Sequence, residues 1–435
     1  MAGSTSGSSS ATVAEGQEQG TQTFAFIAMT CLFFFWGFIT VLNDILIPFL
    51  KESFDLNYTQ AMLVQFCFFG AYFVVSPFAG KLIDKVGYQQ GIVLGLLTTA
   101  AGCLLFYPSA EVHVYALFLF AFFVLASGIT ILQVAANPYV AALGPEKTAA
   151  SRLNLAQAAN SFGTTVGPIV GSALILGAVA ADASAVQMPY VMLGALLVAA
   201  AAVFRFIRLP VLAHVETKED DSGDSVWNHR PLVLGALAIF LYVGGEVSIG
   251  SFLVNYFSES SIAGLSSAEA GEMVAYYWGA AMIGRLVGAA LMNYVASTKY
   301  LAVNALVAII MIIVSMNSAG VILAFELPSL LARVSVFGFA FSESYSINVA
   351  MWSILAVGFF NSIMFPTIFT LAVNGLGSMT SRGSGFVCQA IVGGALIPLV
   401  QGVAADSIGI QLSFIVPMLC YIYIGWYALK GADQN

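Results

Sequence analysis

Two acidic residues lie inside long apolar stretches of this sequence, where they are the side chains most able to do chemistry. Asp44 interrupts the run 24–50, which as a helix would be about 40 Å long and could cross a bilayer. Glu246 follows two glycines in a second such run. A carboxylate within a membrane span is costly and by default marks an ion or substrate pathway. We therefore expect both acids to be functional. The alternatives are an interfacial Asp44 that is wetted from outside, and a Glu246 that only holds a neighbouring helix.

Amide side chains recur in several other apolar runs. Gln133 and Asn137 are four residues apart and share one helical face. Amides donate and accept hydrogen bonds and so suit the hydroxyls of a sugar, although they also join membrane helices at roughly 0.6 kcal/mol each. An indole can stack on a pyranose or belong to an interfacial belt. The candidate substrate-binding residues are Gln133, Asn137, Gln157, Asn160, Glu246, Trp278, Asn361 and Gln389.

Twelve apolar runs are long enough to hold these residues in a membrane. Residues are 60% hydrophobic and 8% charged, whereas about a quarter are charged in an ordinary soluble domain. No basic run could hold a nucleic acid. The length of the runs excludes a β-barrel and predicts an all-α integral membrane protein. The runs are 24–50, 57–82, 87–107, 113–141, 152–176, 188–208, 232–257, 270–295, 299–323, 349–373, 382–404 and 409–430.

Polar segments divide the chain into two halves of six runs. Residues 1–23 predict a disordered cytoplasmic tail, and the acidic segment 209–231 predicts a cytoplasmic linker between halves 24–208 and 232–430. Most Lys and Arg residues lie in or beside the even-numbered connections and the C-terminal tail. Lys51 and Arg333 fall on the other side. Both termini are therefore predicted to be cytoplasmic.

This layout resembles the major facilitator superfamily, whose substrates bind near the midplane between two halves that rock around them. The connection 80–87, with Gly80, Asp84 and Lys85, is similar to the cytoplasmic loop signature of that superfamily. The resemblance implies a conformational latch, with Arg285 as a degenerate counterpart in the second half. A generic charged turn is the alternative for the loop, and we expect Arg285 to pair with a helix end or an acid.

Further motifs, spread over about residues 24–430, make the chain similar to the fucose–galactose–glucose cation symporter family. The resemblance implies that Asp44 couples a cation and that Asn160 binds sugar. Gln133 stands where the fucose branch has a glutamate, and Glu246 where it has a glutamine, which resembles the glucose/galactose branch. The motifs are Leu42-Asn43-Asp44-Ile45-Leu46, Ala135-Ala136-Asn137-Pro138, Leu143-Gly144-Pro145-Glu146, Arg152-Leu153-Asn154-Leu155-Ala156-Gln157, Asn160-Ser161-Phe162-Gly163 and Met364-Phe365-Pro366-Thr367-Ile368-Phe369.

The resemblance leaves the coupling ion open between a proton and sodium. A proton carrier needs a carboxyl group whose pKa is raised by desolvation, and Asp44 could fill that role alone. A sodium site needs an ionised carboxylate with neutral oxygen ligands, for which Asn43, Thr40 and Gln133 are candidates. Because Gln133 offers a ligand and cannot titrate, we favour Na⁺ at Asp44. We expect no other cofactor.

The sequence thus predicts a secondary transporter that couples a cation, Na⁺ or H⁺, to a neutral hexose such as glucose or galactose. It is expected in a bacterial inner membrane, functional as a monomer, with the sugar and the lipid bilayer as partners. A symporter of N-acetylglucosamine or fucose is the alternative within the family, and a membrane sugar sensor is the alternative from another class. No HExxH or GxSxG motif supports an enzyme. Residues 324–348 predict an outer cap or an interfacial helix.

Overall fold

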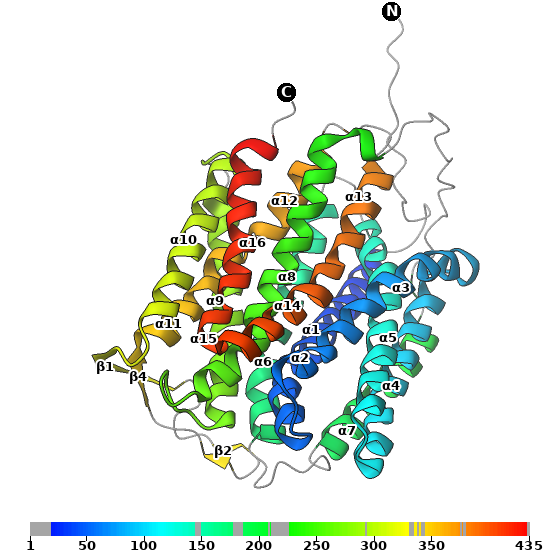
Figure 1. Cartoon of the computed structure of the whole chain (residues 1–435). Helices are drawn as coiled ribbons and strands as arrows, with labels where there is room; N and C mark the ends of the chain where they lie inside the picture. Colours follow the sequence, from blue (N-terminus) through cyan, green and yellow to red (C-terminus); the bar gives the residue numbers. More distant parts are fainter. Residues whose placement is uncertain are drawn as a thin grey trace, which may run out of the picture.

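The computed structural model is a bundle of long helices (Figure 1). It describes residues 19–143, 149–176, 186–207, 209, 226–291, 294–329, 335–336, 339–340, 344–374, 376 and 380–432. The first half holds α1 (Gln19–Ser53), α2 (Tyr58–Ala61), α3 (Leu63–Val86), α4 (Tyr88–Val112), α5 (Tyr115–Ala142), α6 (Ala149–Gly171), the π-helical turn η2 (Ser172–Leu176) and α7 (Gln187–Phe206).

The second half begins with the 3-10 turn η4 (Val226–Asn228). It continues with α8 (Arg230–Ser258), α9 (Ser267–Leu291), α10 (Ser297–Asn317), α11 (Val349–Asn361), α12 (Met364–Val373), α13 (Thr380–Gln389), the 3-10 turn η6 (Ala390–Val392), α14 (Gly393–Ile408), α15 (Ile410–Ser413), α16 (Ile415–Trp426) and the π-helical turn η7 (Tyr427–Gly431).

All twelve predicted runs fall on helices, which confirms the helical membrane fold. Length and composition alone make ten described segments able to span a membrane. The other two predicted runs lie on α6 and α9, which carry many of the polar side chains of the site described below. α1 begins at Gln19, earlier than predicted. Residues 1–18 of the predicted tail and 210–225 of the predicted linker lie outside the described residues.

The helix packing repeats in the two halves. In the first, α1 packs on α6, α4 on α5 and α7, and α3 on α5. In the second, α8 packs on α14, α10 on α11 and α16, and α9 on α11, which are the equivalent pairs. The halves meet where α6 contacts α9, α3 contacts α14, and α1 contacts α8. The domain limits 24–208 and 232–430 remain a prediction that fits this pairing.

Two spans of the second half are broken near their middle. α11 ends at Asn361 and α12 starts at Met364, because Pro366 has no N–H to continue the ladder of the preceding turn. The 3-10 turn η6 separates α13 from α14. Broken helices at membrane depth free backbone groups and are tolerated where they line a cavity or a binding site.

The segment between α10 and α11 contains strands, so the predicted interfacial helix is wrong for its described residues. β1 (Ile322–Pro328) pairs antiparallel with β4 (Ser344–Asn348), with an irregularity between Leu323 and Glu326. The short strands β2 (Ser335–Val336) and β3 (Phe339–Ala340) also pair. Gly320, with φ of +72°, makes the turn that ends α10 and leads into β1.

A buried carboxylate fixes this hairpin to α9. Glu272 has no exposed surface and accepts hydrogen bonds from Ser329 Oγ at 2.7 Å and from the Tyr345 hydroxyl at 2.6 Å. Burial, together with the adjacent Glu272 carboxylate, raises the pKa of Tyr345, so its hydroxyl keeps the proton it donates. Asn348 donates to the carbonyl of Ile262, which ties the end of β4 to the loop after α8.

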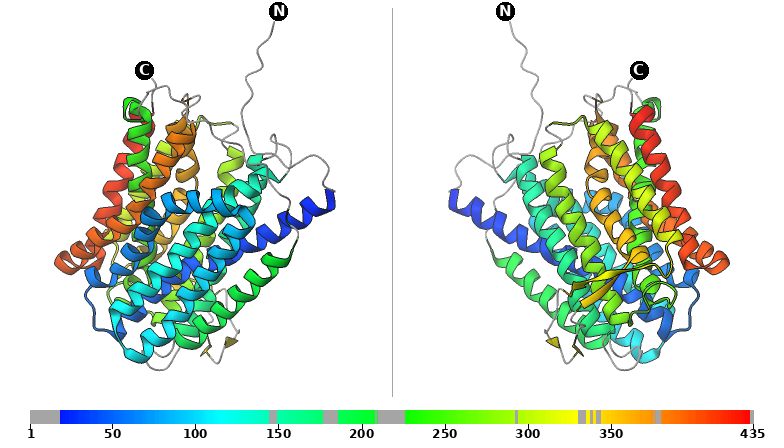
Figure 2. Two further views of the ribbon diagram at one scale, coloured as in Figure 1. Left: turned by 90° about the vertical axis from the view of Figure 1, so that its right-hand side faces the viewer. Right: turned by 90° about the vertical axis from the view of Figure 1, so that its left-hand side faces the viewer.

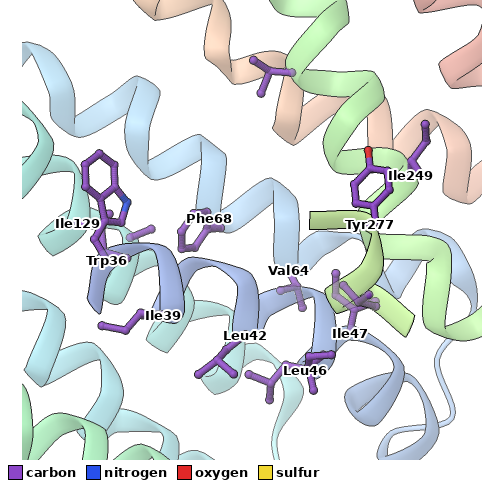
Figure 3. Close-up of a cluster of buried hydrophobic side chains, with 14 of the residues drawn as sticks. Trp36, Ile39, Leu42, Leu46, Ile47, Val64, Phe68, Ile129, Ile249 and Tyr277 are labelled. Atoms are coloured by element: carbon purple, nitrogen blue, oxygen red, sulfur yellow. The ribbon is translucent and has the colours of Figure 1, made fainter. Parts of the chain in front are cut away.

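Two ends of the bundle are named for what they carry. The hairpin end holds the β1–β4 hairpin and the ends of α1 and α8 at Ser53 and Ser258; the linker end holds the start of α8 and η7 (Figure 2). α1 runs obliquely through the core between them. Figure 3 shows its buried Trp36, Ile39 and Leu42 near Val64 and Phe68 of α3. The bundle therefore encloses the second part of α1, where residues 41–50, including Asp44, are all buried.

Candidate functional site

Asp44 lies at the junction of the two halves and is only 6% exposed. Its Oδ1 accepts hydrogen bonds from Gln65 Nε2 of α3 at 3.1 Å and from Ser251 Oγ of α8 at 3.2 Å. Gln65 Nε2 also donates to Ser251 Oγ at 2.8 Å, which closes a triangle. Gln65 and Ser251 are themselves buried. One carboxylate thus joins three helices, two from the first half and one from the second.

A glycine brings α8 close to this carboxylate. A Cβ at Gly250 would lie 3.3 Å from Asp44 Oδ2 and 3.4 Å from the Trp278 ring. Any larger side chain would crowd both groups. The indole of Trp278 therefore lies beside the Asp44 carboxyl group. Its buried Nε1–H has no hydrogen-bond partner of normal geometry among the described residues.

Glu246 belongs to a second polar cluster, formed within the second half. Its Oε1 accepts a hydrogen bond from the Tyr242 hydroxyl at 2.7 Å. Tyr277 of α9, labelled in Figure 3, donates to the Glu246 carbonyl at 3.4 Å. Asn361 Nδ2, at the break after α11, donates to the hydroxyls of Tyr277 at 2.7 Å and Tyr421 at 3.2 Å. Asn361 Oδ1 is buried without a partner in the described part of the chain.

Arg285 connects this second cluster with the first half. Its guanidinium acts electrostatically on Glu246 and Tyr242. Its Nη1 donates to Ser161 Oγ of α6 at 2.7 Å. Glu246 in turn is close enough to Asp44 for their charges to repel. The two acids and Arg285 form one electrostatic system across the contact between the halves.

α6 packs on α1 and α9 and carries two of the predicted sugar-binding amides. Asn160 is half-buried, and its Nδ2 donates to the carbonyl of Phe33 at 3.1 Å. A Cβ at Gly37 would collide with the backbone carbonyl of Asn160, so the glycine allows α1 and α6 to pack this closely. Gln157 lies half-buried one turn earlier on α6. Asn160 is thus held at the α1–α6 contact, one residue from the Ser161 that binds Arg285.

The predicted cation ligands Thr40, Asn43 and Gln133 form no hydrogen bond with the Asp44 carboxylate among the described residues. Thr40 donates to the carbonyl of Trp36 in its own helix at 2.9 Å. Asn43 Oδ1 is buried with no hydrogen-bond partner among the described residues. Gln133 lies half-buried on α5. Among the described residues, Gln65 and Ser251 are the side chains that donate hydrogen bonds to the Asp44 carboxylate.

A further contact between the halves lies at the hairpin end. Asp406 near the end of α14 accepts hydrogen bonds from the backbone N–H groups of Tyr58 at 2.8 Å and Thr59 at 2.9 Å. The Thr59 hydroxyl also donates to it, at 2.6 Å. These N–H groups begin α2, whose first turn has no helical acceptor for them. A carboxylate of one half thus caps a helix of the other.

Residues 25–388 match the major facilitator superfamily. The chain belongs to this superfamily. It is 52% identical to a glucose/galactose transporter of Brucella abortus over 97% of each chain. It is 32% identical to the L-fucose-proton symporter of Escherichia coli over 93% of this chain and 92% of that protein. The crystal structure of that fucose:proton symporter covers 95% of this chain and 100% of its own, at 30% identity and a TM-score of 0.66.

The predicted latch residues of this major facilitator protein lie on two helices, α3 and α9. Gly80 and Lys85 lie in the last two turns of α3 at the linker end. Asp84 belongs to the same helix, but its side chain lies outside the described residues. Arg285 lies on α9 and contacts α6. The predicted amide Gln389 is exposed at the end of α13, and Asn137 Oδ1 on α5 is buried without a described partner.

Sequence reasoning missed several polar residues of this major facilitator site, among them Gln65, Tyr421 and Ser251. Gln65 is an amide within the apolar run 57–82, so the criterion that singled out Gln133 and Asn137 would also have found it. Tyr421 is a tyrosine in an apolar run, where aromatic residues are common. Ser251 carries no comparable signal, because serine is frequent in membrane helices.

Proposed function

We propose that this chain carries a neutral hexose, such as glucose or galactose, across the membrane together with a cation. The observation that supports it most is the buried Asp44 carboxylate, which is hydrogen-bonded to Ser251 at the junction of the halves. Charge at membrane depth is costly and is kept where an ion or substrate passes. The 52% identical transporter of glucose and galactose suggests the substrate class. The named relatives are transporters, which argues against an enzyme.

Unpartnered polar atoms in the interior support a sugar as the substrate. Asn361 Oδ1 and Asn137 Oδ1 are buried without a hydrogen-bond partner among the described residues, and Trp278 Nε1, beside the Asp44 carboxyl group, has none of normal geometry there. Such groups are rare in folded proteins and are satisfied by a ligand or by water. A sugar hydroxyl both donates and accepts, so it can serve all three atoms. We assign sugar binding to these residues with Gln133, Gln157, Asn160, Glu246 and Gln389.

The contacts between the halves support alternating access. Asp406 joins them at the hairpin end, whereas Arg285 joins them at Ser161 on α6. We propose that the half 24–208 rocks against 232–430 about Asp44, with the linker 209–231 between them. The latch at Gly80, Asp84 and Lys85 would hold the linker end closed. Following the distribution of Lys and Arg, we place the hairpin end outside a bacterial inner membrane and both termini in the cytoplasm, with the monomer as the working unit.

We propose Na⁺ as the coupling ion, against the proton used by the fucose relative. The immediate partners of Asp44 are an amide and a hydroxyl, which cannot titrate but carry oxygen atoms. Hard cations prefer carboxylate, amide and hydroxyl oxygens. A proton would need only the carboxyl group.

Uptake by proteoliposomes tests the proposal. The purified chain is reconstituted, and sodium and proton gradients are imposed separately across a panel of glucose, galactose, mannose, N-acetylglucosamine and fucose. We expect glucose or galactose to accumulate with the sodium gradient alone. Labelled-sugar counterflow, which needs no gradient, separates a carrier from a sensor. Absence of counterflow for every sugar would overturn the transport assignment.

A further inference from the structure

A polar cavity of about 300 Å³ opens at the hairpin end between α1 and α8. Its walls include Lys51 and Glu52 of α1, Asp55 in the turn after α1, and Asn255 and Ser258 of α8. Two acids face one lysine there, and the Lys51 ammonium lies 4.4 Å above the centre of the Tyr58 ring. The cavity therefore attracts cations more than anions.

The cavity is in line with the Asp44–Ser251 pair. On α1, Pro48 and Lys51 follow Asp44 by four and seven residues, which places all three on one helical face. On α8, Asn255 and Ser258 follow Ser251 by four and seven residues, again on one face. A helix rises about 1.5 Å per residue, so the first wall residues stand roughly one to two turns above the pair. Asp44 and Ser251 thus lie beneath the floor of the cavity.

The triangle around Asp44 contains oxygen atoms that its hydrogen bonds leave unused. Gln65 is 2% exposed, and its Oε1 has no hydrogen-bond partner among the described residues. Rotation of the amide by half a turn exchanges Oε1 with the Nε2 that now faces Asp44 and Ser251. The Ser251 hydroxyl keeps acceptor capacity when its proton turns away. One small movement therefore converts two donors into two oxygen ligands beside a carboxylate.

We infer that Asp44, Gln65 and Ser251 form a sodium site between the two halves, which the ion reaches from the hairpin end through the polar cavity. The inference rests on the proposed function and replaces the ligands expected from the sequence with Gln65 and Ser251. A bound Na⁺ neutralises the buried carboxylate, whose charge would otherwise be paired only by hydrogen bonds. Ser251 belongs to the second half, so the site is complete only when α8 lies against α1. Ion occupancy is in this way linked to the contact between the halves.

Equilibrium binding of radioactive sodium to the purified full-length protein tests this site. We expect Asp44→Asn to abolish binding. We expect Ser251→Ala and Gln65→Ala to raise the half-saturating Na⁺ concentration by roughly tenfold or more, which corresponds to about 1.4 kcal/mol. Ser109→Ala is the matched control, because Ser109 is a buried serine that donates only within its own helix, to the Leu105 carbonyl. It should bind like the wild type.

The conservative variant Gln65→Glu shows whether Gln65 acts as a sodium ligand or only as a hydrogen-bond donor. Gln65→Glu keeps an oxygen and loses the N–H group, so a ligand role predicts sodium binding at least as tight as the wild type. A donor role predicts that Gln65→Glu binds worse than Gln65→Ala, which would overturn the assignment. Unchanged binding in both Ser251→Ala and Gln65→Ala would overturn it as well, as would uptake driven by protons with no bound sodium. Sugar counterflow by the same wild-type protein reports on the proposed function independently of these results.

Discussion

Ser251 Oγ lies 3.2 Å from Asp44 Oδ1, although the two residues are 207 positions apart and belong to opposite halves of the chain. This hydrogen bond is buried, and the same carboxylate oxygen also accepts from Gln65. A transporter that rocks must break or remake the contacts between its halves in each cycle. A coupling group at such a contact can make that movement depend on its occupancy, because a ligand shifts a conformational equilibrium only through its different affinity for the two states.

Replacement of Asp44 by Asn tests coupling without a large change of shape. The amide oxygen still accepts from Gln65 and Ser251, so the protein should fold, but the charge that attracts a cation is gone. We expect gradient-driven glucose accumulation in vesicles to fall to the background, while gradient-independent counterflow persists. Wild-type accumulation in Asp44→Asn vesicles would show that Asp44 does not couple transport.

Replacement of Glu246 by Gln tests the second cluster. The carboxylate accepts a hydrogen bond from Tyr242 at 2.7 Å. Under the proposed function it also accepts from sugar hydroxyls. Hydrogen bonds to charged groups contribute about 1.5–3 kcal/mol, so we expect the KM for sugar to rise roughly 10- to 100-fold. The half-saturating Na⁺ concentration should change less. Tyr242→Phe is the control for the local hydrogen bond, and an equal loss in both variants would assign Glu246 a structural role.

The sequence was sufficient to predict the helices and the buried Asp44, because a charge within an apolar run has few structural explanations. It did not single out the buried Glu272, although that acid also lies in a predicted run. It could not identify the partner of Asp44. Ser251 is one of several serines in α8, and a contact over 207 positions depends on how the halves pack. The segment 324–348 was also ambiguous, since a short apolar run fits a strand or a helix equally. The antiparallel pairing of β1 with β4, just before α11, makes this segment a hairpin.

Neutralisation of Asp406 should loosen the hairpin end. In Asp406→Asn the N–H groups of Tyr58 and Thr59 keep an acceptor but lose its charge, which contributes about 0.3–1 kcal/mol at a helix start. We expect maleimide to label a cysteine introduced by Ser258→Cys, in the polar cavity, about two- to fivefold faster. Glu111→Gln is the control, because Glu111 pairs with Gln187 within one half. Equally fast labelling in the Glu111→Gln variant would show that Asp406 does not hold the two halves together.

Removal of the Tyr345 hydroxyl should weaken the attachment of the hairpin to α9. Tyr345→Phe leaves the buried Glu272 with one donor fewer, at a cost of about 1–3 kcal/mol. The raised pKa of Tyr345 gives this difference a pH dependence. The folded hydroxyl keeps its proton while an unfolded tyrosine loses it above about pH 10, so the advantage of the wild type is full below that pH and declines above it. Thermal unfolding at pH 8 and at higher pH measures both effects.

Tyr294→Phe, at an 88% exposed tyrosine, should change neither. Equal stability of Tyr345→Phe and the wild type at pH 8 would show that the Glu272 contact does not hold the hairpin.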